Sequence, residues 1–103
     1  MIVYEVNLDV DAEIAEAYLQ WLDAHMREIL RLPGFTGAEL FECVDPEPSA
    51  ARRAICVQYR LLDAVALQRY LREHAPRMRA DGEARFGGRF RAQRRVLEQR
   101  AAI

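Results

Sequence analysis

IVYEVNLDVD, residues 2–11, decides the fold of this chain because apolar and polar side chains alternate along it. The even positions are all apolar: Ile2, Tyr4, Val6, Leu8 and Val10. Glu5, Asn7 and Asp9 lie between them. A period of two is typical of a strand with one face in the core. The stretch therefore predicts a half-buried strand from Ile2 to Val10.

A helix is predicted directly after this strand. Asp11 can cap its N-terminus, and the carboxylates of Glu13 and Glu16 suit the positive end of the helix dipole. The segment Leu32-Pro33-Gly34 should end it. The expected buried stripe recurs every three or four residues and comprises Ile14, Tyr18, Trp21, Leu22, His25 and Ile29.

The middle of the chain predicts a hairpin. Residues 38–44 and 53–61 are expected to be strands, and the segment DPEPSAA between them is rich in turn-forming residues. Asp63 is the expected cap of a second helix, whose buried side carries Leu67, Tyr70, Leu71 and His74.

Proline and glycine divide the rest of the chain. Pro76 should end or kink the second helix, and a short helix can restart there and run towards Phe86. Gly87-Gly88 then leads into a last strand over residues 90–97. Arginines blur the alternation of this strand, which makes it the least regular of the four.

The order β-α-β-β-α-β indicates one α+β domain over residues 1–103, a ferredoxin-like sandwich. Right-handed crossovers place both helices on one face of a four-stranded antiparallel sheet with strand order 4-1-3-2. The other face stays uncovered. It is expected to carry Glu5, Asn7, Gln58 and Arg60, with Phe41, Cys43, Cys56 and Gln93 as further members. Such a mixed face predicts a homodimer, because a second copy would bury it.

Composition narrows the class of protein. Apolar residues make up 51% of the 103 residues and charged residues 30%, as in globular domains. No apolar run is long enough for a bilayer, and the first residues do not read as a secretory signal. We therefore expect a cytoplasmic protein with no membrane partner. Cys43 and Cys56 are expected as reduced thiols, with a cross-strand disulfide as the alternative.

Charge is distributed unevenly along the chain. Residues 1–68 carry a net charge of −7 and residues 69–103 carry +6, which leaves −1 in total. The two halves can attract each other within one domain or across a dimer. An arginine face for nucleic acid is the alternative, but net basic charge and aromatic ribonucleoprotein motifs are both missing. No nucleic-acid partner is expected.

Three segments, together with the helix that contains Trp21 and His25, carry a resemblance to a known family. They are IVYEVNLDVD, VQYRLLDAVALQRYLREHAPRMR and RFGGRFRAQRRVLE. The chain resembles an uncharacterised bacterial family of about this length, known only as a domain of unknown function. The resemblance implies the fold of the dimeric α+β barrels, which include antibiotic-biosynthesis monooxygenases, muconolactone isomerases and haem-degrading monooxygenases. Fold likeness alone does not select one of these chemistries.

Haem-degrading members of that group use an asparagine on the first strand, with a tryptophan and a histidine on the second helix. Asn7 and His74 fall in similar places here, but the second helix has Ala66 and Leu67 instead of a tryptophan. Trp21 lies on the other helix. The resemblance therefore implies no haem, and no cofactor is expected.

Five residues on the expected buried sides can carry chemistry: Trp21, His25, Tyr59, Tyr70 and His74. Each histidine follows an aromatic residue at i−4 on its own helix, so the two would border one cleft if both stripes faced the sheet. A histidine there can act as a general base or an axial ligand, and the alternative is a structural histidine bonded to its surroundings. These residues are the candidate ligand-binding site.

Other motifs are weaker. Arg77, Arg79 and Arg85 can hold a carboxylate or phosphate, and the alternative is a solvated helix face paired with nearby acids. No GxSxG, HExxH, CxxC or carboxylate cluster is present, so no metal site is expected.

Three functions stay open at this point. The first is a dimeric protein that binds a small molecule in a cleft between helices and sheet. The second is a non-catalytic dimerising or interaction module, and the third is a cofactor-free enzyme of the monooxygenase or isomerase type.

Overall fold

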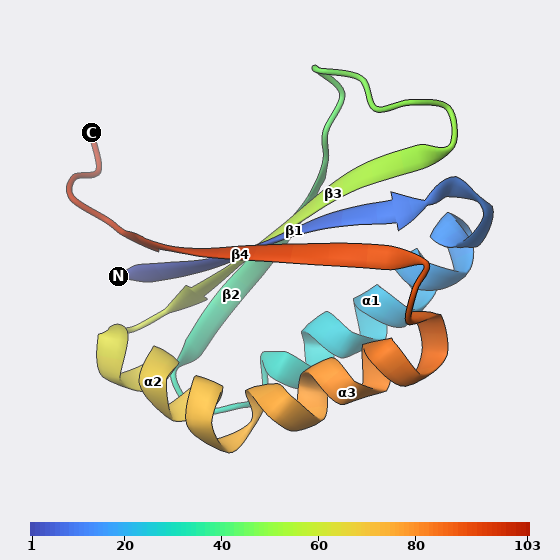
Figure 1. The fold of residues 1–103 in the computed structure, drawn as a ribbon. Coiled ribbons are helices and arrows are strands. Elements are labelled where there is room, and N and C mark those ends of the chain that lie inside the picture. Colours follow the sequence, from blue (N-terminus) through green and yellow to red (C-terminus); the bar gives the residue numbers. More distant parts are fainter.

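Strands and helices follow one another in the predicted order, and the computed structural model describes residues 1–103 throughout. The strands are β1 (Ile2–Asp11), β2 (Phe35–Glu42), β3 (Arg52–Leu61) and β4 (Phe90–Glu98). The helices are a 3-10 turn η1 (Ala12–Ile14), α1 (Ala15–Ile29), α2 (Ala64–Glu73) and α3 (Ala75–Phe86). The strands form one antiparallel sheet in the order β2-β3-β1-β4, and the helices lie on one of its faces (Figure 1). The ferredoxin-like α+β fold and its strand order are confirmed.

The register of β1 divides its side chains between the two faces as the alternation predicts. Tyr4 lies opposite Tyr59 of β3, and both side chains are buried beneath the helices. Glu5, one residue later, belongs to the opposite face and pairs with Gln58 of β3 and Arg95 of β4. The even positions of β1 therefore line the core, and the odd positions line the uncovered face.

The first helical segment begins less regularly than expected. The Asp11 carboxylate accepts a hydrogen bond from the Glu13 N–H at 3.1 Å, as its capping role predicts. Residues 12–14 nevertheless form a 3-10 turn before α1 starts. The next strand begins at Phe35, three residues before the predicted start. The Phe35 ring packs edge-on against Tyr70 with ring centroids 5.1 Å apart, which draws the start of β2 towards the core.

The second helical segment divides at His74, and Pro76 lies in the first turn of α3. Proline lacks the N–H that would continue the α2 ladder, so the division at this point is confirmed. The Asp63 carboxylate accepts a hydrogen bond from the Ala66 N–H at 2.9 Å and caps α2. The continuation is not short, however, because α3 has 12 residues.

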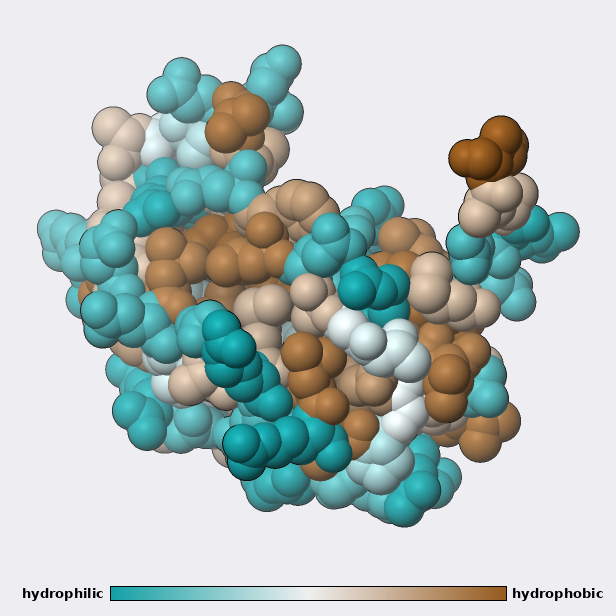
Figure 2. Space-filling model, turned by 180° about the vertical axis from the view of Figure 1, so that it is seen from behind, coloured by the Kyte–Doolittle hydropathy of each residue, from teal (hydrophilic) through white to brown (hydrophobic).

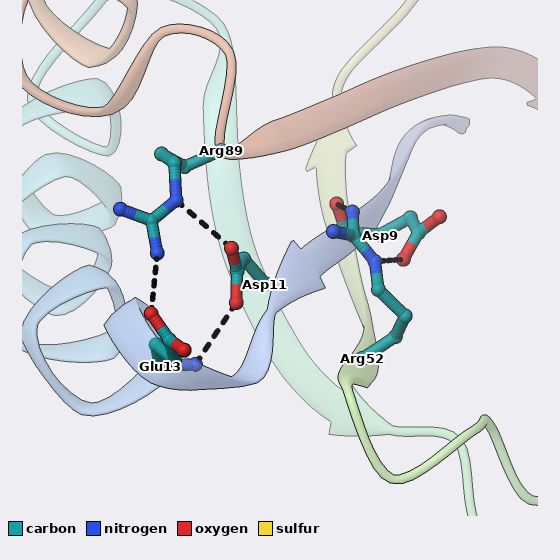
Figure 3. Close-up of polar contacts among 5 residues, drawn as sticks. All are labelled: Asp9, Asp11, Glu13, Arg52 and Arg89. Atoms are coloured by element: carbon teal, nitrogen blue, oxygen red, sulfur yellow. Dashed lines mark hydrogen bonds and ion pairs between the residues drawn. The ribbon is translucent and has the colours of Figure 1, made fainter.

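Two arginines tie the end of β1 to later parts of the chain (Figure 3). Arg89, just before β4, donates to Asp11 at 2.8 Å and to Glu13 at 3.1 Å. Arg52 at the start of β3 donates to the Asp9 carboxylate at 2.9 Å and to the Asp9 carbonyl at 3.1 Å. Arg89 therefore joins the acidic and the basic parts of the chain within one domain.

The core lies between the sheet and the helices and contains 16 buried apolar residues. Val10, Val57 and Leu61 on the strands have no exposed surface, and Tyr18 and Ile29 on α1 are 2% exposed. Burying a side chain of this size contributes about 1.5–3 kcal/mol before conformational entropy is subtracted. None of the helices combines the length and the apolar character that crossing a membrane would require.

The uncovered sheet face combines polar clusters with exposed apolar surface. Phe41 on β2 is 46% exposed, and Cys43 and Cys56 are unpaired thiols. Viewed from behind, apolar side chains reach the surface in several places between hydrophilic ones (Figure 2). The structure thus shows the predicted uncovered face, and it holds the two cysteines as free thiols.

Candidate functional site

A cavity lies under the middle of the sheet, between the strands and the helices. Its volume is about 50 Å³. Its walls come from β1, β3 and β4 on one side and from α1, α2 and α3 on the other. A space of this size holds a few water molecules, since one water needs about 10–15 Å³ on this measure. A larger occupant would have to displace side chains at its mouth.

Two groups of aromatic rings line the cavity. On the side of α2, the Tyr4 ring lies 6.2 Å from Tyr59 and 5.9 Å from Tyr70, measured between centroids. On the side of α1, the Tyr18 ring lies 5.5 Å from Trp21 and 5.2 Å from Phe90. The cavity contacts both groups. It therefore presents flat apolar surfaces from two directions.

Three tyrosine hydroxyls in this wall have no partner within the protein. Tyr18, Tyr59 and Tyr70 are 2–4% exposed, and their hydroxyls make no hydrogen bond to protein atoms. Every fully buried polar side-chain atom of the protein does have a hydrogen-bond partner, so these hydroxyl oxygens are not fully buried. Their hydroxyls must therefore contact open space, which for side chains so deeply buried is the cavity they line. Burial raises the pKa of Tyr18 and of Tyr70 to about 12, and it raises the pKa of Tyr59 as well. At neutral pH all three are neutral phenols that can donate a hydrogen bond.

Two arginines without a carboxylate partner also line the cavity. Arg79 on α3 donates to the Tyr4 hydroxyl at 2.8 Å, and it forms no ion pair. Arg94 lies opposite Val6 in the sheet, so it belongs to the face covered by the helices. No protein group pairs with its guanidinium. Both arginines are largely exposed and mark the open side of the cavity.

His25, stacked on Trp21, lies between the cavity and a second, outer hollow. Their rings are stacked with centroids 4.4 Å apart, and the Trp21 indole N–H donates to Asp81 of α3 at 2.8 Å. His25 and Met78 line both the cavity and the outer hollow, which has a volume of about 270 Å³. Burial lowers the pKa of His25, with smaller opposing effects from neighbouring acids. The imidazole is neutral at pH 7 and can accept a proton or a hydrogen bond.

Gly82 explains how Trp21 comes so close to α3. A Cβ at position 82 would lie 2.9 Å from the Trp21 ring. Glycine inside a helix costs about 1 kcal/mol relative to alanine, so its place in α3 needs a compensating reason. The close approach of the indole ring supplies that reason and holds Trp21 where it lines the cavity.

The structure brings four of the five predicted site residues together. Trp21, His25, Tyr59 and Tyr70 all line the cavity. His74 does not: it lies between α2 and α3, with its Nδ1 3.1 Å from Arg77 Nη1, so the two histidines do not border one cleft. The chain turns at His74, which directs its side chain to the helix junction instead of the sheet.

Sequence reasoning missed several residues of the cavity wall. Tyr4 and Tyr18 were expected only as core residues, and Arg94 only as a break in the alternation of the last strand. The even positions 90, 92, 94 and 96 lie on the covered face of β4, and that period would have placed Arg94 there. Of the three arginines expected to hold an anion, only Arg79 lines the cavity; Arg85 pairs with Asp81 at 3.2 Å.

The opposite face of the sheet centres on Glu5. Its side chain is 4% exposed and accepts hydrogen bonds from Arg95 at 2.6 Å, Asn7 at 2.8 Å and Gln58 at 2.9 Å. These bonds, led by that of Arg95, lower the pKa of Glu5 to about 2. Asn7 is thus committed to Glu5 on the uncovered face, far from a role in the cavity. Nowhere do three or more histidine, cysteine or acidic side chains gather in a way that could hold a metal ion.

Comparisons with known proteins give a family and a fold. Residues 1–100 match the family described as Domain of unknown function (DUF4286). No curated protein matches the chain in sequence.

Solved structures with the same fold are distant in sequence. A putative antibiotic biosynthesis monooxygenase from Deinococcus radiodurans has a TM-score of 0.76 at 15% identity, over 100% of this chain and 96% of that chain. SnoaB, a cofactor-independent oxygenase from Streptomyces nogalater, has a TM-score of 0.70 at 14% identity, over 99% and 96%. The heme-degrader MhuD from Mycobacterium tuberculosis, with two hemes bound in its active site, has a TM-score of 0.69 at 16% identity, over 100% and 99%. At these identities the likeness establishes the ferredoxin-like fold.

Proposed function

We propose that this chain, which belongs to the DUF4286 family, is a homodimeric α+β barrel protein that binds a small molecule in the cavity between its helices and its sheet. One observation carries the binding proposal. Three nearly buried tyrosines, whose hydroxyls bond to no protein atom, line one cavity. A ligand that accepts hydrogen bonds from these hydroxyls would take the place of the water that otherwise solvates them.

The fold likeness fits this proposal in general terms. Two of the similar structures are described as an oxygenase and a monooxygenase, and a third as a heme-degrader. If the chain catalyses a reaction, His25 is the general base available in the cavity, because its imidazole is neutral and free of protein hydrogen bonds.

The cavity residues do not fit haem. The space of about 50 Å³ is far below the size of a porphyrin, and the His25 ring is stacked flat on Trp21. His74, the residue placed most like an axial ligand in sequence, lies outside the cavity beside Arg77. The small molecule proposed for this cavity is therefore not haem.

Trp21, the single tryptophan of the chain, reports directly on occupancy. We expect its emission to change with at least one of three ring compounds, neutral benzamide, anionic benzoate and cationic benzylamine, and we expect the same compound to raise the melting temperature. The matched variant is Tyr59→Phe, which keeps the ring and removes one hydroxyl donor. No response from any of the three compounds in the folded wild-type protein would refute the binding proposal.

The dimer is proposed on the uncovered sheet face. Phe41 lies there 46% exposed, beside the charged Glu39–Arg60 pair and the Glu5 cluster, so one face offers apolar area and both signs of charge to a second copy. In a two-fold dimer the same patch meets itself, and such mixed patches can be self-complementary. Light scattering should return twice the chain mass of 11.9 kDa.

A charged substitution on each side of the molecule tests which surface is used. Phe41→Arg should give a monomer, whereas Val65→Arg, at a 77% exposed position on α2, should leave the dimer intact. A wild-type mass of 11.9 kDa, or a dimer that survives Phe41→Arg, would contradict the proposal.

A non-catalytic dimerising module is the second candidate, and the small volume of the cavity favours it. It predicts a dimer with no Trp21 response to any ring compound. Both candidates predict a dimer, so the fluorescence measurement is the one that separates them.

A further inference from the structure

We infer that the cavity takes a ring-containing organic anion, whose acidic group is held by Arg94 and Arg79 at the mouth while its ring lies between the two aromatic groups of the wall. This inference rests on the proposed binding function and names the class of ligand.

The charge at the mouth is the first reason. Most arginines of the chain form ion pairs; Arg89, for example, bonds to both Asp11 and Glu13. Arg79 and Arg94 pair with no carboxylate, although both line the cavity. Their charges come from different elements, α3 and β4, and they are the exposed residues of the cavity lining. An arginine fork binds a planar carboxylate through two parallel hydrogen bonds, so an organic acid would supply the missing partner.

The polarity inside the cavity is the second reason. The hydroxyls of Tyr18, Tyr59 and Tyr70 are neutral donors, and no carboxylate lines the wall. A cationic ligand would therefore find two arginines and no counter-charge. An anionic or oxygen-rich ligand would find donors at each of these groups.

The shape of the wall is the third reason. The rings of Tyr4 and Tyr59 on one side, and of Tyr18 and Trp21 on the other, present flat faces and edges at centroid distances of 5.5–6.2 Å within each group. Such walls favour a flat ring, which gains aromatic contacts beyond the burial of area. Because the enclosed volume is about 50 Å³, the ring must enter by displacing exposed groups at the mouth. Arg79 and Arg94 have long, exposed side chains, and these are the groups that would move aside.

Arg94 and Arg91 allow a matched test. They lie three residues apart on β4, neither has an ion-pair partner, and their side chains belong to opposite faces of the sheet. Arg94→Gln should weaken benzoate binding about tenfold or more, the size expected for losing a charge-assisted hydrogen bond. Arg91→Gln should leave benzoate affinity unchanged. Arg94→Lys should recover part of the affinity, because it keeps the charge and loses the planar fork.

The probes are benzoate, benzamide, benzylamine, acetate and inorganic phosphate, each titrated against the full chain with Trp21 emission and melting temperature as readouts. We expect benzoate to bind more tightly than benzamide, and benzylamine, acetate and phosphate to bind weakly or not at all. Binding of benzamide with equal or higher affinity would overturn the anion assignment while the binding proposal stands. Equal binding of acetate or phosphate would overturn the ring assignment. Equal losses in Arg94→Gln and Arg91→Gln would overturn the role of Arg94.

Discussion

Replacing Glu5 by glutamine should destabilise the fold in a way that depends on pH. Glu5 accepts three hydrogen bonds on the uncovered face and is 4% exposed. Glutamine has nearly the same shape, but it carries no charge and points an N–H2 group at neighbours that are themselves donors. The variant should therefore fold with the same sheet while losing the charge-dependent part of the interaction.

The lowered pKa of Glu5 sets the size of the expected loss in the free energy of unfolding. A fall from 4.5 to about 2 corresponds to about 3 kcal/mol at 1.36 kcal/mol per pKa unit. Glu5 lies on the sheet face that no helix covers, so solvent screening reduces this figure, and we expect a difference of about 1–2 kcal/mol in the free energy of unfolding at pH 7. Because the folded pKa is lowered, this stability is fully present above pH 4.5 and is lost as the pH falls towards 2.

Urea unfolding of the wild type and the variant at pH 7 and at pH 3 measures the difference directly. Most of it should be gone at pH 3, because the unfolded chain by then binds the proton that the folded chain still excludes. Glu39→Gln is the matched control: Glu39 also bonds to an arginine, at 2.6 Å, but its side chain is 58% exposed. That change should cost less than about 0.5 kcal/mol. A difference for Glu5→Gln that is the same at both pH values would refute the reasoning.

Three further predictions concern the helices. Asp63→Ala removes the N-cap of α2 and should cost about 1 kcal/mol in urea unfolding, and an unchanged midpoint would show that the cap bond contributes nothing. Helix propensity alone predicts that Gly82→Ala would stabilise the protein by roughly 1 kcal/mol, but we expect no gain because the new Cβ displaces the Trp21 ring. The emission of Trp21 should shift in this variant. A more stable variant with unchanged emission would contradict the close contact. His25 should titrate below pH 6.5 in an NMR pH series, and its contribution to stability should fall as the pH drops from 6.5 towards that lower value; a midpoint above 6.5 would show that Glu28 and Asp81 outweigh burial.

The alternation of β1 was sufficient to predict the sheet, because each side chain of a strand faces one side or the other and the period survives any tertiary arrangement. The site was harder to predict. The sequence pattern placed four of the site residues on buried stripes: Trp21, His25, Tyr59 and Tyr70. A stripe shows which way a side chain points, but it does not show whether that side chain lines a cavity or is packed against its neighbours.

His74 shows where that limit matters. The helical period placed it with Tyr70, and the break before Pro76 then turned it away from the sheet. Arg94 is the opposite case, a site residue that the pattern did not select. An arginine on the covered face only interrupts the alternation of the strand, and its place in the site becomes clear once the cavity is known. The open hydroxyls of the tyrosines depend on packing, which no periodicity encodes.

The place of β1 in the sheet has a consequence for how the chain is made. β1 precedes the other three strands along the chain, yet its two neighbours in the sheet are β3 and β4, and β4 follows after a further 78 residues. Until β4 leaves the ribosome, one edge of β1 has no partner and the Glu5 carboxylate lacks Arg95. Long-range pairings of this kind close late and leave an exposed strand edge in the meantime. A chain in which β4 has not yet paired with β1 therefore exposes a strand edge to which another chain can add.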